Sequence, residues 1–315
     1  MGKELTLRPV AHRGMHEKAP ENTMAAFQAA AEAGCCIETD IRMSADGEVM
    51  IFHDENFLRL CRGLNEIPDG PMETFTREEI SRIRLPYGGH VTGNFFPENG
   101  YQSEEWYNYP WPLDQEKAIL ARAAAYGEMT PAQRINRLLA DYDSAYRAAC
   151  EADPRWEPVP TLEEFLRWVA LQPDGFFAEI EFKGLGMSRK VFDLIEKTGT
   201  ASKCILMSGD LAHVREMQET AAQDGKPAGL RFGVNIRWCD EAHLSLLEGY
   251  DLWELGLNAG AFDAADVARL ADRGVVVFAN LGDTPDWWET LIQTGAVAFK
   301  TNTPSRYLEW YHQRG

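Results

Sequence analysis

Long apolar runs are absent from the sequence. No stretch of it approaches the roughly 18 consecutive apolar residues that a transmembrane helix requires. Residues 1–9, MGKELTLRP, also lack the apolar core of a secretion signal. We therefore expect no stable association with a membrane and a location in the cytoplasm.

Basic residues are scarce relative to acidic ones. The chain has 31 lysines and arginines against 49 aspartates and glutamates, which gives a formal net charge of −18. Nucleic acids and anionic membrane surfaces bind clusters of basic side chains, so we expect neither as a partner. A small anionic substrate remains compatible with this charge, provided that its site supplies local positive charge.

Cysteine patterns typical of disulfide frameworks or metal sites are missing as well. The six cysteines are scattered without metal-ligand spacing, at Cys35, Cys36, Cys61, Cys150, Cys204 and Cys239. We expect them to be the reduced thiols of a cytosolic protein.

The sequence does contain a regular alternation of strand and helix patterns, in a composition ordinary for a globular protein. Helical patterns separate most of the predicted strands, and this alternation predicts a parallel sheet with right-handed crossovers. The strands are predicted from short runs rich in β-branched or aromatic residues, at 8–12, 36–42, 48–53, 176–182, 203–207, 229–235, 251–257, 275–279 and 297–301.

Capping residues mark the ends of several predicted helices. Asn22 is placed to begin a helix that ends at Gly34. Residues 161–164, Thr-Leu-Glu-Glu, form a capping box. Thr284 and Pro285 predict another helix start, and Gly295 predicts its end.

One predicted strand is surplus to an eight-stranded barrel, and a hairpin accounts for it. Asp46-Gly47 is a strong signal for a two-residue turn, so 36–45 and 48–55 are expected to pair antiparallel, with 48–53 an accessory strand. The remaining eight strands predict a (β/α)8 TIM barrel with a β-hairpin after its second strand.

The predicted hairpin places chemistry-bearing side chains together. A two-residue turn would pair Asp40 with His53, and Glu38 would share their face because strand side chains alternate. Two carboxylates and an imidazole are costly to bury unless they bind a cation or one another, so this face is either a metal site or a solvated polar face. The opposite face should pack against the protein, through Ile37, Ile41, Met43, Met50 and Phe52.

Residues 86–155 do not follow the alternation. We interpret them as an insertion into a barrel formed by residues 1–85 and 156–315. The insertion has seven aromatic residues between Phe95 and Trp111 and a helical pattern from Thr130 to about Cys150. The aromatic residues either line a pocket for an apolar or quaternary-ammonium group or form a small core of the insertion itself.

Two further strands carry polar groups where a barrel would place its active site. The first ends in His12 and Arg13, a proton-transfer group beside a phosphate-binding one. In the strand around 176–182, Glu179, Glu181 and Lys183 alternate onto one face. Residues at the C-terminal ends of barrel strands face the active site, so these groups are candidates for it.

Eight short motifs occur along the chain: His-Arg-Gly at 12–14, Pro-Glu-Asn-Thr at 20–23, Ala-Phe at 26–27, Glu-Thr-Asp at 38–40, Asp-Gly at 46–47, His-Asp at 53–54, Pro-Thr-Leu-Glu-Glu at 160–164 and Glu-Phe-Lys at 181–183. In these motifs the sequence resembles the glycerophosphodiester phosphodiesterase family. Two departures from the family lie near the C-terminus, where residues 275–281 lack the family's tryptophan and Asn302 replaces an acidic residue.

The resemblance implies a metal-dependent TIM barrel that hydrolyses glycerophosphodiesters to glycerol 3-phosphate and an alcohol, with residues 86–155 as a capping segment. Oxygen ligands suit Mg²⁺ or Ca²⁺. The roles carried over by position are a divalent-cation site at Glu38, Asp40 and Glu181, a general acid/base pair at His12 and His53, and phosphate contacts from Arg13 and Lys183. Glu179 is then expected either to be structural or to support the metal ligands without binding the metal, and His16 to be an exposed loop residue.

Two alternatives stay open. One is a phospholipase D-like lyase that acts on lysophospholipid or sphingomyelin and forms a cyclic phosphate on a similar barrel. Such relatives are generally secreted and disulfide-bonded and lack the motifs at 20–23 and 181–183. The other is a catalytically silent, metal-binding barrel.

Overall fold

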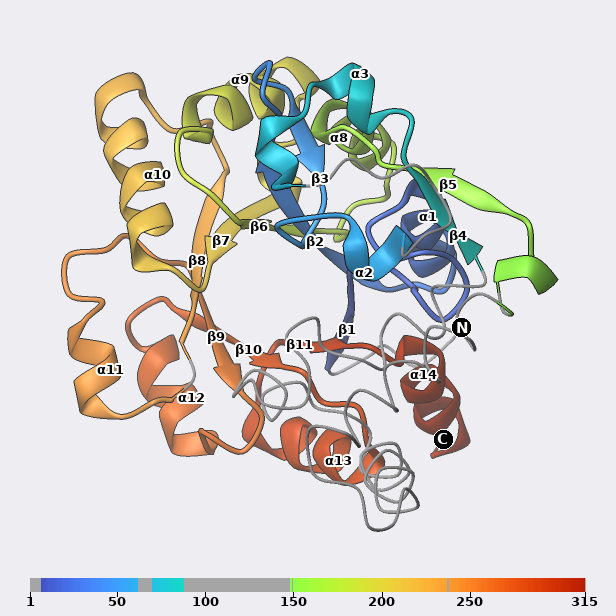
Figure 1. Cartoon of the computed structure of the whole chain (residues 1–315). Coiled ribbons are helices and arrows are strands. Elements are labelled where there is room, and N and C mark those ends of the chain that lie inside the picture. The colour runs from blue at the N-terminus through green and yellow to red at the C-terminus, as the bar shows by residue number, and fades with distance from the viewer. Residues whose placement is uncertain (1–6, 62–69, 88–147, 149, 237, 315) are drawn as a thin grey trace, which may run out of the picture.

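Eight parallel strands close into a barrel in the computed structural model, which describes residues 7–61, 70–87, 148, 150–236 and 238–314. The strands follow one another around the barrel in the order β1-β11-β10-β9-β8-β7-β6-β2, and β2 pairs back with β1 (Figure 1). This confirms the predicted TIM barrel. The strands are β1 (Arg8–His12), β2 (Cys36–Met43), β6 (Ala178–Phe182), β7 (Cys204–Ser208), β8 (Arg231–Asn235), β9 (Glu254–Asn258), β10 (Val276–Asn280) and β11 (Ala298–Thr301).

Helices follow the strands along the chain and lie outside the barrel (Figure 1). Their apolar faces and the outward residues of the strands form the main core. No helix in the described part of the chain is both long and apolar enough to cross a membrane. The helices are α1 (Met24–Glu32), α8 (Leu162–Ala170), α9 (Ser188–Thr198), α10 (Leu211–Asp224), α11 (Glu241–Ser245), α12 (Ala264–Ala271), α13 (Pro285–Thr294) and α14 (Pro304–Gln313).

The helix ends follow the predicted caps with one exception. Thr161 and Glu164 form the predicted capping box of α8. Helix α13 starts after Thr284 and ends at Gly295, which has a left-handed backbone. The predicted cap at Asn22 is wrong, because the hydroxyl of Thr23 accepts the capping hydrogen bond of α1.

The barrel interior changes character along its axis. Six buried residues fill the part nearest the N-terminal ends of the strands with apolar side chains: Val10, Cys36, Phe177, Ile205, Phe278 and Ala298. Toward the C-terminal ends of the strands most inward residues are polar or charged, although β7 contributes Met207. All six cysteines are buried, and none of them forms a disulfide in the described part of the chain.

The hairpin differs from the prediction by one residue. Strand β3 (Val49–Ile51) pairs antiparallel with β2, with Ile41 opposite Ile51 and Met43 opposite Val49. The loop has three residues, 45–47, because the amide of Ser44 donates to the carbonyl of Glu48 over 2.8 Å. Its last residue, Gly47, has φ +79°, the backbone that closes three-residue hairpins.

The longer loop also changes which face each side chain occupies, since a one-residue shift of register reverses a strand. Ile37 and Ile41 pack in the main core with Val49 and Ile51. The predicted packing of Met50 and Phe52 on that same face is wrong. They belong to a second cluster that lies beside the barrel.

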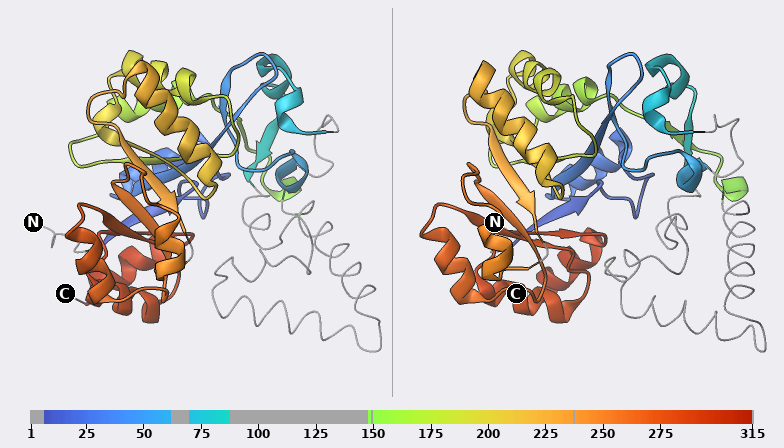
Figure 2. Two further views of the ribbon diagram at one scale, coloured as in Figure 1. Left: turned by 90° about the vertical axis from the view of Figure 1, so that its left-hand side faces the viewer. Right: turned by 60° about the vertical axis from the view of Figure 1, so that its left-hand side comes forward.

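This second cluster lies under the chain that follows the hairpin. Its elements are α2 (Leu58–Cys61), η1 (Met72–Thr74), α3 (Arg77–Ile80) and a two-stranded sheet of β4 (Arg84–Pro86) and β5 (Trp156–Pro158). Both views of Figure 2 show α2, η1, α3 and β4 together at one side of the barrel.

Pairing of β4 with β5 brings the two ends of the predicted insertion, 86–155, side by side. The aromatic residues between Phe95 and Trp111 lie outside the described residues, as does nearly all of the helical pattern from Thr130 to Cys150. The insertion and its capping role therefore stay predictions.

Candidate active site

Three carboxylates converge at the C-terminal ends of β2 and β6. Glu38 and Asp40 alternate along β2 and point into the barrel, and the register places Asp40 beside Glu181 of β6. One oxygen from each of the three lies within 4.8 Å of the others. The structure thus brings together the residues expected to bind a divalent cation.

One of these carboxylates is left partly unsatisfied by the protein itself. Glu38 and Asp40 are buried, and the Oε1 atom of Glu38 accepts no hydrogen bond. Burial, followed by the nearby charges of Asp40 and Glu181, raises the pKa of Glu38 well above its usual value. A buried carboxylate with an unused oxygen atom fits a hard divalent cation, which prefers oxygen ligands.

Lys183 and Arg13, the expected phosphate contacts, lie against the same carboxylates. The Nζ atom of Lys183 is 2.8 Å from Glu181 and 3.2 Å from Asp40. Arg13 contacts Asp40 at 3.4 Å and Glu21 at 2.8 Å. Burial alone would raise the pKa of Asp40, but the charge of Lys183 and then those of His53 and Arg13 lower it.

Asn22 supports this cluster instead of capping a helix. Its amide donates to Oδ2 of Asp40 over 2.9 Å and accepts from the hydroxyl of Thr39 over 2.8 Å. Asn22 reaches these partners with a φ of +56°, a left-handed conformation that asparagine adopts more readily than most residues. The Asn in the motif at 20–23 therefore orients a carboxylate of the site.

His53 reaches the cluster from beyond the end of β3. The corrected register places Phe52, not His53, beside Asp40, and the Phe52 amide donates to the Asp40 carbonyl over 3.0 Å. The His53 Nδ1 atom lies 2.6 Å from the carboxylate of Asp54, which is itself buried. Burial, followed by the charges of Arg13 and Lys183, lowers the pKa of His53.

His12 is held by an amide instead of a carboxylate. Its Nδ1 atom lies 2.8 Å from Oδ1 of Asn302, and its Nε2 atom lies 3.9 Å from Glu38. Burial, followed by the charge of Arg13, lowers the pKa of His12 well below its usual value.

Asp283, which the sequence analysis missed, determines how Asn302 is oriented. The side-chain and backbone N–H groups of Asn302 donate to the two oxygens of Asp283 over 2.9 and 2.8 Å. The amide oxygen must then face His12, so Nδ1 of His12 is the donor and its Nε2 is free to accept a proton. Asp283 stands in a loop that no motif marks.

His16 is not the exposed loop residue that was expected. It is buried, and its Nε2 atom lies 3.2 Å from the same oxygen of Asn302. The amide that replaces the family's acidic residue therefore contacts two imidazoles.

A second charged cluster lies deeper in the barrel. The Nζ atom of Lys300 is 2.8 Å from Glu179 and 3.1 Å from Oδ1 of Asn235. Glu254 lies close to this pair, and burial followed by the charge of Glu179 raises its pKa well above its usual value. The sequence analysis missed Lys300 and Glu254, although a charged residue inside an otherwise apolar strand is a usable signal.

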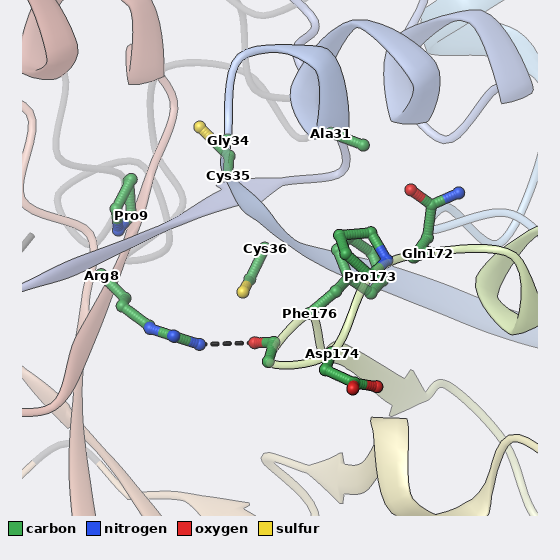
Figure 3. Close-up of a pocket in the computed structure, with 11 residues that line it drawn as sticks. Arg8, Pro9, Ala31, Gly34, Cys35, Cys36, Gln172, Pro173, Asp174 and Phe176 are labelled. Carbon is green, nitrogen blue, oxygen red and sulfur yellow. Dashed lines mark hydrogen bonds between the residues drawn. The ribbon is translucent and has the colours of Figure 1, made fainter. Parts of the chain in front are cut away.

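A cavity of about 250 Å³ opens at the opposite pole of the barrel. Figure 3 shows Arg8, at the start of β1, donating across it to the carbonyl of Gly175, with Cys36 beside them. Its lining includes none of the catalytic candidates. Active sites of such barrels lie at the C-terminal face, so we place the site at the carboxylates.

Comparison with known proteins adds family information to this geometry. The model of the glycerophosphoryl diester phosphodiesterase family matches residues 12–306. A glycerophosphodiester phosphodiesterase of Caldanaerobacter subterraneus is 36% identical over 91 residues, which are 28% of this chain and 35% of that protein. The human glycerophosphodiester phosphodiesterase 1 is 36% identical over 90 residues, which are 28% of this chain and 25% of that protein. The matched stretch thus spans about a third or less of these relatives.

Solved structures share the fold at low sequence identity. A putative glycerophosphoryl diester phosphodiesterase from Silicibacter pomeroyi has a TM-score of 0.66 at 15% identity, covering 99% of this chain and 96% of that one. An Oleispira antarctica phosphodiesterase, solved in complex with the product sn-glycerol-3-phosphate, has a TM-score of 0.63 at 17% identity, covering 97% and 96%. These likenesses show the same barrel.

Proposed function

Because the chain belongs to the glycerophosphoryl diester phosphodiesterase family, we propose that it hydrolyses glycerophosphodiesters to glycerol 3-phosphate and an alcohol. One observation carries the proposal: three carboxylates converge within 4.8 Å at the barrel mouth, and two imidazoles with fixed partners flank them. Such a set can bind a cation and move two protons, which are the tasks that phosphodiester hydrolysis requires.

Glu38, Asp40 and Glu181 are the proposed ligands of a divalent cation, Mg²⁺ or Ca²⁺. The close approach of the three carboxylates and the buried Oε1 atom of Glu38, which accepts no hydrogen bond, support this assignment. When bound, such a cation offsets the negative charge of the phosphodiester and of the departing oxygen.

His12 and His53 are the proposed general base and general acid. The carboxylate of Asp54 favours the protonated form of His53, whereas the amide oxygen of Asn302 gives His12 a weaker partner. We therefore assign Nε2 of His12 to accept the proton of the attacking water. His53 then donates a proton to the alkoxide as its bond to phosphorus breaks.

Lys183 and Arg13 supply positive charge beside the phosphate. Lys183 is the better candidate for direct contact, because its side chain is 19% exposed whereas that of Arg13 is 4% exposed. Arg13 lies between Glu21 and Asp40 and pairs with both carboxylates.

The test is a product assay with defined substrates. Purified protein is supplied with Mg²⁺ and Ca²⁺ separately, and glycerol 3-phosphate is measured after incubation with a panel of glycerophosphodiesters. We expect turnover that EDTA removes, and a loss of about 100-fold or more in kcat for His12→Ala and His53→Ala. His312→Ala is the matched control, because His312 is exposed on α14.

The outcomes separate this function from its alternatives. Failure to cleave any diester in either metal would refute the proposal, and thermal stabilisation by metal without turnover would indicate a silent barrel. A cyclic phosphate that persists in the phosphorus NMR spectrum would indicate the lyase.

A further inference from the structure

A second cavity adjoins the one at the N-terminal pole of the barrel. It has a volume of about 310 Å³ and shares Arg8 and residues 174–176 with the cavity described above. Its wall includes Phe177 and Phe278, which belong to the apolar cluster that fills this end of the barrel. We call this second cavity the pole cavity. It lies at the opposite end of the barrel from the carboxylates.

Three basic side chains line the pole cavity: Arg8, Lys203 and Arg231. Arg8 begins β1 and Arg231 begins β8, while Lys203 ends the short helix η3 (Ala201–Lys203), which precedes β7. The three residues are far apart in the sequence, so closure of the barrel brings them to one cavity.

Backbone carbonyls, and not carboxylates, hold these three side chains. Arg8 and Lys203 donate to carbonyls of the loop at 172–175, which precedes β6. Nη2 of Arg231 donates to the carbonyl of Ser202 over 3.0 Å. None of the three forms an ion pair with an acidic side chain within the described residues. The carbonyls therefore orient the cations without cancelling their charge.

Acidic residues near the pole cavity do not neutralise it. The carboxylate of Asp174 is exposed and points away from Arg8 (Figure 3). Glu254 lies close enough to Arg231 to affect its pKa, but burial raises the pKa of Glu254 well above its usual value and favours its neutral form. The pole cavity is thus positively charged in a protein whose net charge is −18.

Arg231 has a hydrogen-bond donor that the protein leaves unused. Its Nε atom is buried and finds no acceptor among the described residues. Its guanidinium group lies over the ring of Trp253, 4.4 Å from the ring centre, and burial lowers its pKa. A buried donor without an acceptor is costly, and more so when it is charged. An anion is therefore the natural partner of Arg231.

A phosphate group matches this set of cations. A phosphate monoester carries nearly two negative charges at neutral pH, and guanidinium groups bind it through parallel N–H donors. The pole cavity is larger than a phosphate group requires, and its volume falls in the range of small-molecule sites. Its remaining wall is largely apolar and includes Phe177, Trp253 and Val297. A ligand that fills the cavity should thus carry an apolar group beside its phosphate.

We propose that the pole cavity binds a phosphate monoester with an apolar or aromatic group, at a site separate from the active site. The phosphate contacts Arg8, Lys203 and Arg231, and the apolar group rests against Phe177 and Trp253. This inference does not depend on the proposed phosphodiesterase function, because a monoester has no second ester bond for that reaction to cleave.

Isothermal titration calorimetry of the metal-free protein tests the site, with phenyl phosphate and inorganic phosphate as the probes. We expect phenyl phosphate to bind at least tenfold more tightly, because inorganic phosphate has no group for the apolar wall. Arg231→Gln and Lys203→Gln should each weaken phenyl phosphate binding at least tenfold. Arg77→Gln, which removes an exposed charge from α3, is the matched control that keeps the affinity. Circular dichroism and thermal unfolding show whether the variants are folded.

Hydrogen–deuterium exchange locates the probe without any substitution, so the test does not depend on the folding of the variants. Saturating phenyl phosphate should slow exchange in peptides that cover 170–177 and 200–204. Peptides that cover 12–14 and 181–183, at the active site, should exchange as before.

Several results would overturn the inference. These are no binding of phenyl phosphate, equal affinity for the two probes, or an affinity that survives both Arg231→Gln and Lys203→Gln. Protection confined to the barrel mouth, or a loss of binding in Lys183→Gln alone, would place the probe at the active site and overturn it as well. A protein that binds phenyl phosphate at the pole but cleaves no diester would refute only the proposed function.

Discussion

Removing the buried positive charge of Lys300 inside the barrel should destabilise the protein strongly. Lys300 lies 2.8 Å from Glu179, and both side chains are almost fully buried. Burial alone would lower the pKa of Lys300, but Glu179 and Glu254 raise it above its usual range, so the residue is charged. The substitution Lys300→Met keeps much of the side-chain length and removes that charge.

The magnitude follows from what remains after the substitution. Glu179 would be a buried carboxylate with no counterion, and Glu254 beside it could not supply one. Breaking a buried ion pair by removing one partner costs about 3–5 kcal/mol. At about 2–4 °C per kcal/mol for a large domain, the melting temperature should fall by roughly 10 °C.

Urea and thermal unfolding of the metal-free protein measure this cost, with two further variants as controls. Lys226→Met removes the same charge from an exposed pair with Asp251, where the cost should be at most about 1 kcal/mol. The double variant Lys300→Met/Glu179→Gln removes both charges and should recover most of the lost stability. Equal costs at the buried and exposed lysines, or a double variant less stable than the single one, would refute the reasoning.

Three further predictions concern single residues. Thr161→Ala removes the capping hydroxyl of α8 and should cost about 1 kcal/mol in urea unfolding; an unchanged midpoint would contradict the cap. Gly256→Ala would place a Cβ atom 1.8 Å from Asn235 and should cost about 1–3 kcal/mol in thermal unfolding; a melting temperature equal to that of the natural protein would contradict this close approach. Burial and then Arg13 lower the pKa of His53, so NMR should show it titrating below about pH 6.5; its contribution to stability is present above that pH and is lost as the pH falls through the folded value.

The barrel was predictable because each of its strands carries a local signal. Short apolar runs and readable caps recur along the chain, and the number of runs matches the closed sheet once the hairpin is set aside. The hairpin register was not predictable in the same way. Asp46-Gly47 fits both a two-residue and a three-residue loop, and the choice depends on contacts such as the backbone N–H of Arg77 donating to the Asp46 carboxylate over 2.9 Å.

The error in register did not remove His53 from the site, and the reason is geometric. β3 ends at Ile51, so strand alternation no longer decides where His53 points. The bend after the strand and the bond to Asp54 do so instead. The charges of His53 and Asp40 still influence each other, although the cross-strand pairing that predicted their grouping is wrong.

The residues that sequence reasoning missed are recognisable only from their contacts with other elements of the fold. Lys300, Glu254 and Asp283 match no motif, and their partners lie on different elements. Only closure of the barrel brings β6, β9 and β11 to one interior, so no spacing along the chain could pair these charges.

Asn302 departs from the family pattern, and its contacts with Asp283 partly compensate for the change. The family's acidic residue would place a negative charge directly against His12. Here the carboxylate belongs to Asp283, and Asn302 lies between it and His12. Asn302 therefore fixes the direction of the hydrogen bond with His12 without adding a charge. His12 keeps a defined tautomer but loses the carboxylate that would favour its protonated form.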